Sequence, residues 1–373
     1  MEPIGYNKKR ASQILEKNNI DALIATTPVN VFYTTGIPTL HVAPNPILFV
    51  LYNQYPSFSI ITNDGEVFLL IWMLYDSVET FSWVKDYERI GSPQGALKIL
   101  GEKIEELGLE NKTLGIETLM PRYQSEFLRK KFSNASFVDG DNHFLEMRLI
   151  KSEEEIKRIK KSTEIAEKAI LKCVEAVKEG ITDYELLQIA RSTIVGEGAE
   201  GWDHLTMNIG NSDPEAPGVG TVVRPSEMIR FDFGAVWKGY VSDVSREAIL
   251  GEVPKKGAMA MENMIKVQEF CLENLKPGTN PKKLYDDTYK YFKQIGKGRC
   301  NIIGHSIGLE TEETHIIGPG HSFNGLIEEN MVLDVEAWQI VRGQGLVGIE
   351  DCYRITSSDC ERLSNLEKEI FLR

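Results

Sequence analysis

Helical and strand-like patterns alternate along the first part of the chain. The spacing of apolar residues predicts helices over residues 8–17 and 95–107. Apolar runs of strand length are found at residues 22–27, 47–52, 57–62, 67–71 and 112–117. Interleaved helices and strands of this kind are typical of an α/β domain.

The pattern changes near residue 150, where a long amphipathic helix is predicted to begin. Ser152 and Glu155 have the spacing of a capping box, in which both side chains bind free backbone amides at a helix start. Apolar and small residues then recur every three or four positions until Gly180. Further helices are predicted over residues 183–195 and 258–275. We expect two domains, an α/β N-terminal domain (1–143) and a second domain (144–373).

Residues 228–248 have the pattern of a β-hairpin, with two β-rich runs around Trp237, Lys238 and Gly239. A turn centred between Trp237 and Lys238 would place Asp232 directly opposite Asp243. Opposed residues project from the same face, with Cβ atoms about 4.5–5.5 Å apart. Two carboxylates held so close repel each other, and a divalent cation is the simplest compensation.

A second hairpin is predicted over residues 331–357. Centring its turn on Gly343 places Glu336 opposite Glu350, whereas Asp334 faces Cys352 and is left out of the predicted site. Each carboxylate alone could be a solvated strand residue. Two facing pairs together favour a metal site.

His305 lies between the two hairpins, in an apolar segment flanked by Gly304 and Gly308. A lone histidine is more often a hydrogen-bonded structural residue. Together with the four carboxylates, however, one imidazole suits two divalent ions that share bridging carboxylates.

The net charge bears on possible partners, and the cysteine pattern and N-terminal residues bear on the cellular compartment. The 373 residues carry 55 acidic and 42 basic side chains, a net charge of −13, which disfavours binding to nucleic acids and to anionic membranes. The five cysteines include no C-x-x-C pair, and the N-terminal residues lack an apolar signal-peptide core. We therefore expect a cytoplasmic protein.

The motifs resemble those of the pita-bread metallopeptidases, which include methionine aminopeptidase, aminopeptidase P, prolidase and creatinase. The family series D-x-G, S-D, G-H-x-x-G, E and I-E-D is matched around Asp232, Asp243, His305, Glu336 and Glu350. Residues 28–36 are similar to the N-x-x-Y-x-T-G segment of the Xaa-Pro peptidase branch, and residues 148–156 to the start of its catalytic domain.

The resemblance implies a creatinase/prolidase-like N-terminal domain and an α+β pita-bread catalytic domain. Asp232 would bind one ion, His305 and Glu336 the other, and Asp243 and Glu350 would bridge the two. The cofactor would be two divalent metal ions, with manganese placed first and cobalt, zinc or iron as alternatives. The substrate would be a small peptide or amide, and the protein a homodimer.

Three positions depart from the family pattern. Gly218 or a neighbour, Glu312 and Gly348 stand where the resemblance predicts a histidine, a second histidine and an arginine that position substrate. Glu312 and Glu313 are therefore the candidates for general acid–base catalysis, although Glu313 could instead orient His305.

Two other histidines are possible replacements for the missing ones. His204 is a candidate substrate-binding residue. His315 lies at an odd offset from position 312 and so would point to the other face of an extended segment.

Three functions remain open at this point. The first is a dinuclear hydrolase of the Xaa-Pro peptidase class. The second is a creatinase-like hydrolase of a non-peptide C–N bond, and the third is a catalytically idle binding module.

Overall fold

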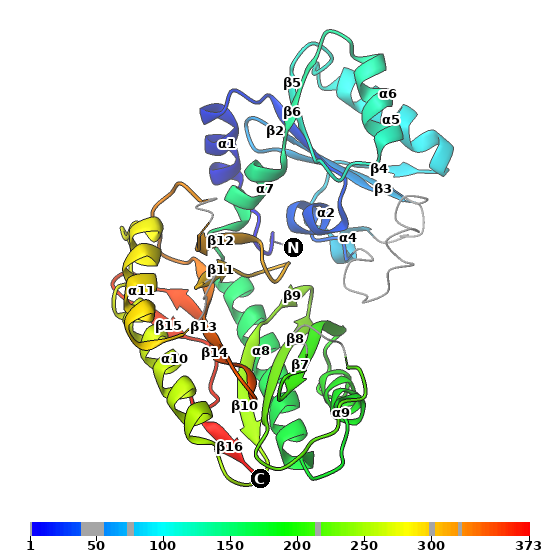
Figure 1. Ribbon diagram of the computed structural model, residues 1–373. Helices are drawn as coiled ribbons and strands as arrows, with labels where there is room; N and C mark the ends of the chain where they lie inside the picture. The colour runs from blue at the N-terminus through cyan, green and yellow to red at the C-terminus, as the bar shows by residue number, and fades with distance from the viewer. Residues whose placement is uncertain (1, 39–55, 73–77, 213–217, 298–302, 320–322) are drawn as a thin grey trace. The chain divides into compact units, whose positions relative to one another are not determined.

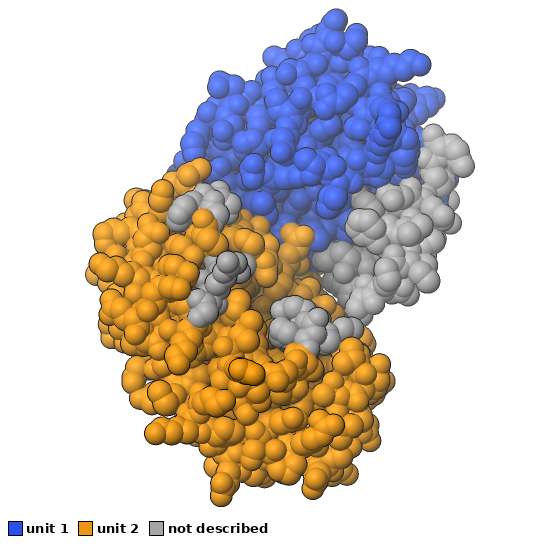
Figure 2. Space-filling model, in the orientation of Figure 1, with its two compact units in different colours: residues 1–149 blue, residues 150–373 orange. Residues whose placement is uncertain are grey.

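The computed structural model describes residues 2–38, 56–72, 78–212, 218–297, 303–319 and 323–373. The chain divides into two compact units, Met1–Leu149 and Ile150–Arg373 (Figure 2). Among the described residues, no helix combines the length and the apolar character needed to cross a lipid bilayer.

The first unit is built on a six-stranded mixed sheet with the order β4-β3-β2-β1-β5-β6 (Figure 1). Its strands are β1 (Ala22–Ala25), β2 (Phe58–Thr62), β3 (Val67–Trp72), β4 (Tyr87–Ile90), β5 (Thr113–Ile116) and β6 (Ser136–Asp139). Its helices are α1 (Lys8–Lys17), α2 (Pro28–Thr35), α4 (Val78–Phe81), α5 (Pro93–Glu106), α6 (Arg122–Lys131) and α7 (Asp141–Arg148). Strand β1 pairs with β5 in parallel and with β2 antiparallel, in keeping with an α/β unit.

Helix α7 spans the position where the sequence suggested the domain boundary, 143/144. It packs against α1, and Phe144 and Met147 are buried within the first unit. The side chain of Arg10 also donates two hydrogen bonds to the carbonyl oxygen of Glu146. The contacts therefore place the division after Leu149, at the end of this helix.

The second unit is built on a ten-stranded sheet whose main order is β12-β11-β13-β14-β10-β8-β7. The strands on this path are β7 (Gly201–Ile209), β8 (Met228–Trp237), β10 (Val244–Ile249), β11 (Gly304–Ser306), β12 (Thr314–Ile317), β13 (Val332–Val341) and β14 (Gly345–Ile355). The short strands β9 (Tyr240–Val241), β15 (Cys360–Arg362) and β16 (Ile370–Leu372) pair with β8, β14 and β10. The helices are α8 (Glu153–Ala176), α9 (Asp183–Gly196), α10 (Lys255–Glu273) and α11 (Pro281–Ile295).

Helices α8 and α10 cover one face of this sheet (Figure 1). Phe231 and Phe233 of β8 join the apolar core that lies under α8. On the other half of the sheet, Gln268 of α10 donates to the carbonyl oxygen of Val335 and to the carboxylate of Asp351 (2.8 and 3.3 Å). Because side chains alternate along a strand, the even-numbered residues of β8, β13 and β14 project from the opposite face. That face carries the candidate site.

Most predicted elements are confirmed, because their patterns are local. Helix α1 has the predicted bounds, and α8 begins with the capping box of Ser152 and Glu155. Strands β2, β3 and β5 and helices α5, α9 and α10 also lie where the pattern placed them, apart from differences of a few residues at their ends. The strand predicted at residues 47–52 lies outside the described residues.

Candidate metal centre

The hairpin β8–β10 contradicts one detail of the sequence prediction. Asp232 pairs with Ser245 and not with Asp243. The reason is the turn, which consists of Lys238 and Gly239, both in the left-handed region (φ 50° and 82°), and so moves the register by two residues. A shift of two preserves the face, so Asp232 and Asp243 still converge, as diagonal neighbours.

The second hairpin has the predicted register. Glu336 of β13 lies opposite Glu350 of β14, and Asp334 lies opposite Cys352. Asp334 is nevertheless fully buried, and neither of its carboxylate oxygens has a hydrogen-bond partner among the described residues. Burial raises its pKa well above the ordinary value.

His305 on β11 has a fixed orientation that presents one nitrogen to the carboxylates. Its Nδ1 lies 2.9 Å from the carbonyl oxygen of Thr311. A carbonyl can only accept, so Nδ1 carries the hydrogen and donates it. Nε2 then faces Oε1 of Glu350 at 3.4 Å and Oδ2 of Asp243 at 3.9 Å. Three acceptors directed at one another require a cation between them, either a proton or a metal ion.

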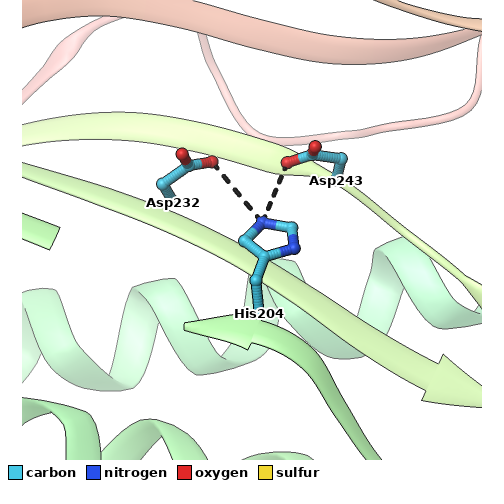
Figure 3. A group of neighbouring side chains, drawn as sticks. All are labelled: His204, Asp232 and Asp243. Carbon is cyan, nitrogen blue, oxygen red and sulfur yellow. Dashed lines mark ion pairs between the residues drawn. The ribbon is translucent and has the colours of Figure 1, made fainter. Parts of the chain in front are cut away.

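His204 likewise presents one ring nitrogen to two carboxylates, Asp232 and Asp243 (Figure 3). Its Nδ1 lies 3.1 Å from a carboxylate oxygen of Asp203, and its Nε2 lies 3.1 Å from Oδ1 of Asp243 and 3.7 Å from Oδ1 of Asp232. A one-residue register shift between Trp202 and Leu205 marks a β-bulge, which re-aims the side chains it contains. Thr206 pairs with Asp232, so His204, two residues earlier, projects from the same face into the site, and Asp203 of the bulge lines the cavity beside it.

Side-chain oxygens in this cluster lack hydrogen-bond partners. Within the described part of the chain, Oδ1 of Asp232 and Oδ1 of Asp243 have no partner of good hydrogen-bond geometry, although both residues are buried. Two groups have ligand atoms within 4.8 Å of one another: His204, Asp232 and Asp243, and Asp243, His305 and Glu350. Asp243 belongs to both. Oxygen and imidazole ligands of this kind fit divalent ions such as manganese, zinc or iron.

The pKa values of the clustered carboxylates show that their negative charges repel one another in a buried environment. Burial and the neighbouring carboxylate of Glu350 raise the pKa of Asp243 to about 7. Burial and Glu350 likewise raise the pKa of Glu336 well above its usual value. Asp232 differs from Asp243 and Glu336: burial would raise its pKa, but Arg230 and His204 outweigh that effect and lower it.

Arg230 is a site residue that the sequence analysis missed. It lies two positions before Asp232 on β8 and is 4% exposed. Its guanidinium donates from Nη1 to Oδ2 of Asp232 at 2.5 Å, and Nη2 lies 3.7 Å from Oε2 of Glu350. Strand parity was the signal that could have found it, because residues 230 and 232 share a face.

The cluster forms the floor of a cavity of about 550 Å³. Its apolar wall consists of Trp338, Ile340 and Leu346, and Asp203, Thr311 and Glu312 also line it. The wall residues share the faces of Glu336 and Glu350 along β13 and β14, so the same parity rule could have predicted them.

The structure separates the two glutamates that the sequence proposed as catalytic. Glu312 lines the cavity, and one of its carboxylate oxygens lies 2.6 Å from Nε2 of His315. Glu313 is buried and paired with Lys151 at 2.6 Å, and it is not among the residues that line the cavity. Nδ1 of His305 is held by the Thr311 carbonyl, so Glu313 does not orient that ring through Nδ1.

Two of the three positions that depart from the family pattern, 218 and 348, are glycines, and the structure explains why a larger residue does not fit at either. Gly218 has a φ of +99°, and a Cβ there would lie 2.9 Å from Leu187; residues 213–217 before it are outside the described residues. At Gly348, a Cβ would lie 2.5 Å from Cβ of Trp338 and 2.6 Å from the carbonyl oxygen of Ala337. The close approach of β13 and β14 therefore excludes an arginine at position 348.

Known proteins share this fold along nearly the whole chain. A Xaa-Pro dipeptidase of Pyrococcus horikoshii is 26% identical over 376 residues, covering 99% of this chain and 100% of the relative. The crystal structure of the prolidase from Pyrococcus horikoshii OT3 matches with a TM-score of 0.81 at 26% identity, covering 98% of this chain and 99% of that one. An X-Pro aminopeptidase from Thermotoga maritima matches in fold, with a TM-score of 0.80 at 23% identity and the same coverage of 98% and 99%.

The fold and the acidic, histidine-bearing cavity define a metal-dependent peptidase of the pita-bread type. The family profile of metallopeptidase family M24 matches residues 157–357, and that of the creatinase/prolidase N-terminal domain matches residues 8–150. The chain belongs to metallopeptidase family M24.

Proposed function

We propose that the protein is a dinuclear metal-dependent hydrolase of the Xaa-Pro peptidase type whose substrate carries a cationic group. The observation that carries the proposal is the pair of three-residue clusters that share Asp243 on the cavity floor. Each cluster would hold one divalent ion, with manganese as the first choice. Bound ions of this kind supply Lewis-acid activation of a water molecule and of the scissile carbonyl group.

The residues of the two clusters would act as the ligands of the two ions. Asp232 and His204 would hold one ion, and His305 and Glu350 the other, with Asp243 common to both clusters. Glu336 would contribute from its position opposite Glu350, the residue that the family resemblance makes a second bridging ligand. His204 thereby becomes a candidate ligand, where the sequence suggested a substrate-binding residue. Its Nε2 is directed at two carboxylates on the cavity floor (Figure 3).

Substrate selection follows from the charges beside the floor. Asp203 and Glu312 both line the cavity, and the side chain of Glu312 is 51% exposed. A free amino group or another cation on a small substrate would pair with them, whereas a carboxylate would be repelled. Trp338, Ile340 and Leu346 offer an apolar wall for the substrate side chain.

Glu312 also makes neutral Xaa-Pro dipeptides poor substrates. Loss of one preorganised group that stabilises the transition state typically costs about 10²–10³ in rate. Neither position 312 nor position 348 supplies the side chain that the resemblance predicts there. A non-peptide C–N hydrolase on the same fold is the second candidate, and the same two positions favour it.

The test is a substrate panel at saturating manganese. It contains neutral Xaa-Pro dipeptides, peptides with a lysine or free amine in different positions, and cationic non-peptide amides. Wild type should prefer the cationic members, and Glu312→His should lose that preference and gain activity on neutral dipeptides. Fast wild-type turnover of neutral dipeptides that Glu312→His reduces would contradict the proposal, and activity on non-peptide amides alone would establish the second candidate.

A further inference from the structure

Arg230 is a permanent positive charge in the middle of the proposed metal cluster. It comes from the same strand face as Asp232, is nearly fully buried and lines the cavity. The cavity floor has four carboxylates, and Arg230 contacts two of them, Asp232 at 2.5 Å and Glu350 at 3.7 Å. Burial without a partner would be costly for a guanidinium, so these contacts hold it in place.

The neighbouring residues on β10 and β14 explain why the positively charged side chain is supplied by β8. Glu247 of β10 pairs with Arg230 of β8, and its Oε1 accepts a hydrogen bond from the backbone N–H of Gly348 on β14 at 3.0 Å. Gly348, Glu247 and Arg230 therefore form one row across three neighbouring strands. Position 348 has no room for a side chain, so the basic side chain beside Asp232 and Glu350 comes from β8 instead of β14.

We propose that Arg230 is a positioning residue that acts as the built-in counter-charge of the metal cluster. In the metal-free protein it offsets the repulsion between Asp232 and Glu350. It also engages Oδ2 of Asp232, which leaves Oδ1 as the oxygen available to a cation, and Oδ1 is the atom without a hydrogen-bond partner among the described residues. In the loaded protein the same charge repels the ions and weakens their binding.

This inference rests on the proposed metal binding and predicts opposite effects on the two states. Removing the charge destabilises the metal-free protein, because the carboxylates lose their compensation. It also strengthens metal binding, because an ion no longer faces a positive neighbour. A purely structural arginine would lower the stability of both states equally.

The experiment compares Arg230→Met, which keeps much of the side-chain volume, with Arg230→Lys, which keeps the charge. Melting temperatures are measured after chelation and at saturating manganese, and the manganese dissociation constant is measured by calorimetry. Arg230→Met should widen the interval between the two melting temperatures and lower the dissociation constant on the order of tenfold. Arg230→Lys should stay within about threefold of wild type, since its charge is retained.

Arg362→Met is the matched control. Arg362 forms an ion pair with Asp351 at 2.8 Å, on the face of β14 opposite the site. Its removal should lower both melting temperatures equally and leave manganese affinity unchanged.

Each result decides one of the two proposals. Equal losses in both states for Arg230→Met, or weaker manganese binding, would overturn the role of Arg230. If Arg230→Met does not fold, a tenfold change in affinity for Arg230→Lys in either direction would overturn it. A wild-type protein that binds no manganese would instead refute the proposed function, before any variant is compared.

Discussion

The ring of His204 lies directly beside the backbone of Gly234, where a Cβ atom would come within 2.7 Å of Cε1 and Nδ1 of the ring. The same Cβ would lie 2.5 Å from the carbonyl oxygen of Ser242. Gly234, two residues after Asp232, therefore leaves the room in which the ring of His204 reaches the carboxylates.

Gly234→Ala should displace His204 and destabilise the protein. Overpacking of this kind costs about 1–3 kcal/mol. Denaturant unfolding measures the loss, and manganese affinity should fall with it. Gly196→Ala, at the end of α9 where a Cβ meets nothing within 4 Å, is the control and should be neutral or stabilising. Unchanged manganese affinity in Gly234→Ala would show that His204 is not a ligand.

Asp243→Asn should lose most of both metal ions, because Asp243 belongs to both clusters. Glu336→Gln should lose chiefly one, since Glu336 lies opposite Glu350 and outside the His204 cluster. Metal analysis after dialysis against manganese gives the stoichiometry of each variant. Equal losses in the two variants would contradict the assignment of Asp243 as the shared ligand.

The metal-free protein should become less stable as the pH rises from 6 to 8.5. The folded pKa of Asp243 is about 7 and that of Glu247 about 8, both raised by burial above the ordinary values of 3.8 and 4.5. Between those values the folded state binds more protons than the unfolded state, so stability is lost as pH rises through the folded pKa. The pKa values of His204 and His305 are raised as well and act in the same direction.

Melting temperatures of chelated protein across this pH range, at constant ionic strength, test the prediction. Saturating manganese should reduce or reverse the trend, because metal binding displaces these protons and strengthens as pH rises. A chelated protein that is more stable at pH 8.5 than at pH 6 would contradict the raised pKa values of Asp243 and Glu247.

Lys151→Met should be strongly destabilising, and the double variant Lys151→Met/Glu313→Gln should recover much of the loss. Breaking a buried pair leaves an uncompensated charge, at a cost of about 3–5 kcal/mol. The glutamine oxygen can still accept the hydrogen bond that Leu309 N–H donates to Glu313 at 3.0 Å. Chemical unfolding measures the recovery.

The same double variant tests the catalytic role that the sequence suggested for Glu313. If the residue is structural, turnover and metal content should return together with stability. A stable, metal-loaded but inactive double variant would restore Glu313 as a catalytic residue.

The amino-acid sequence by itself determined what depends on neighbouring residues. The capping box at Ser152, the bounds of α1 and the register that opposes Glu336 and Glu350 follow from local hydrogen bonds, apolar spacing and the short turn at Gly343. In the β8–β10 hairpin, the local pattern predicted the face of each carboxylate but not the exact pairing. Its turn was misplaced, yet Asp232 and Asp243 stayed on one face because an error of two residues preserves strand parity.

Only the tertiary structure decided which distant residues complete the site. His204 reaches the site because β7 pairs with β8: Thr206 lies opposite Asp232, and His204 shares the face of Thr206 by alternation. The separate environments of Glu312 and Glu313 depend on where Lys151 is buried. The row of Gly348, Glu247 and Arg230 arises because β14 lies beside the β8–β10 hairpin, which brings Gly348 to Glu247, about a hundred residues away in the chain. Strand order is set by the packing of the whole sheet and its helices, and no local pattern encodes it.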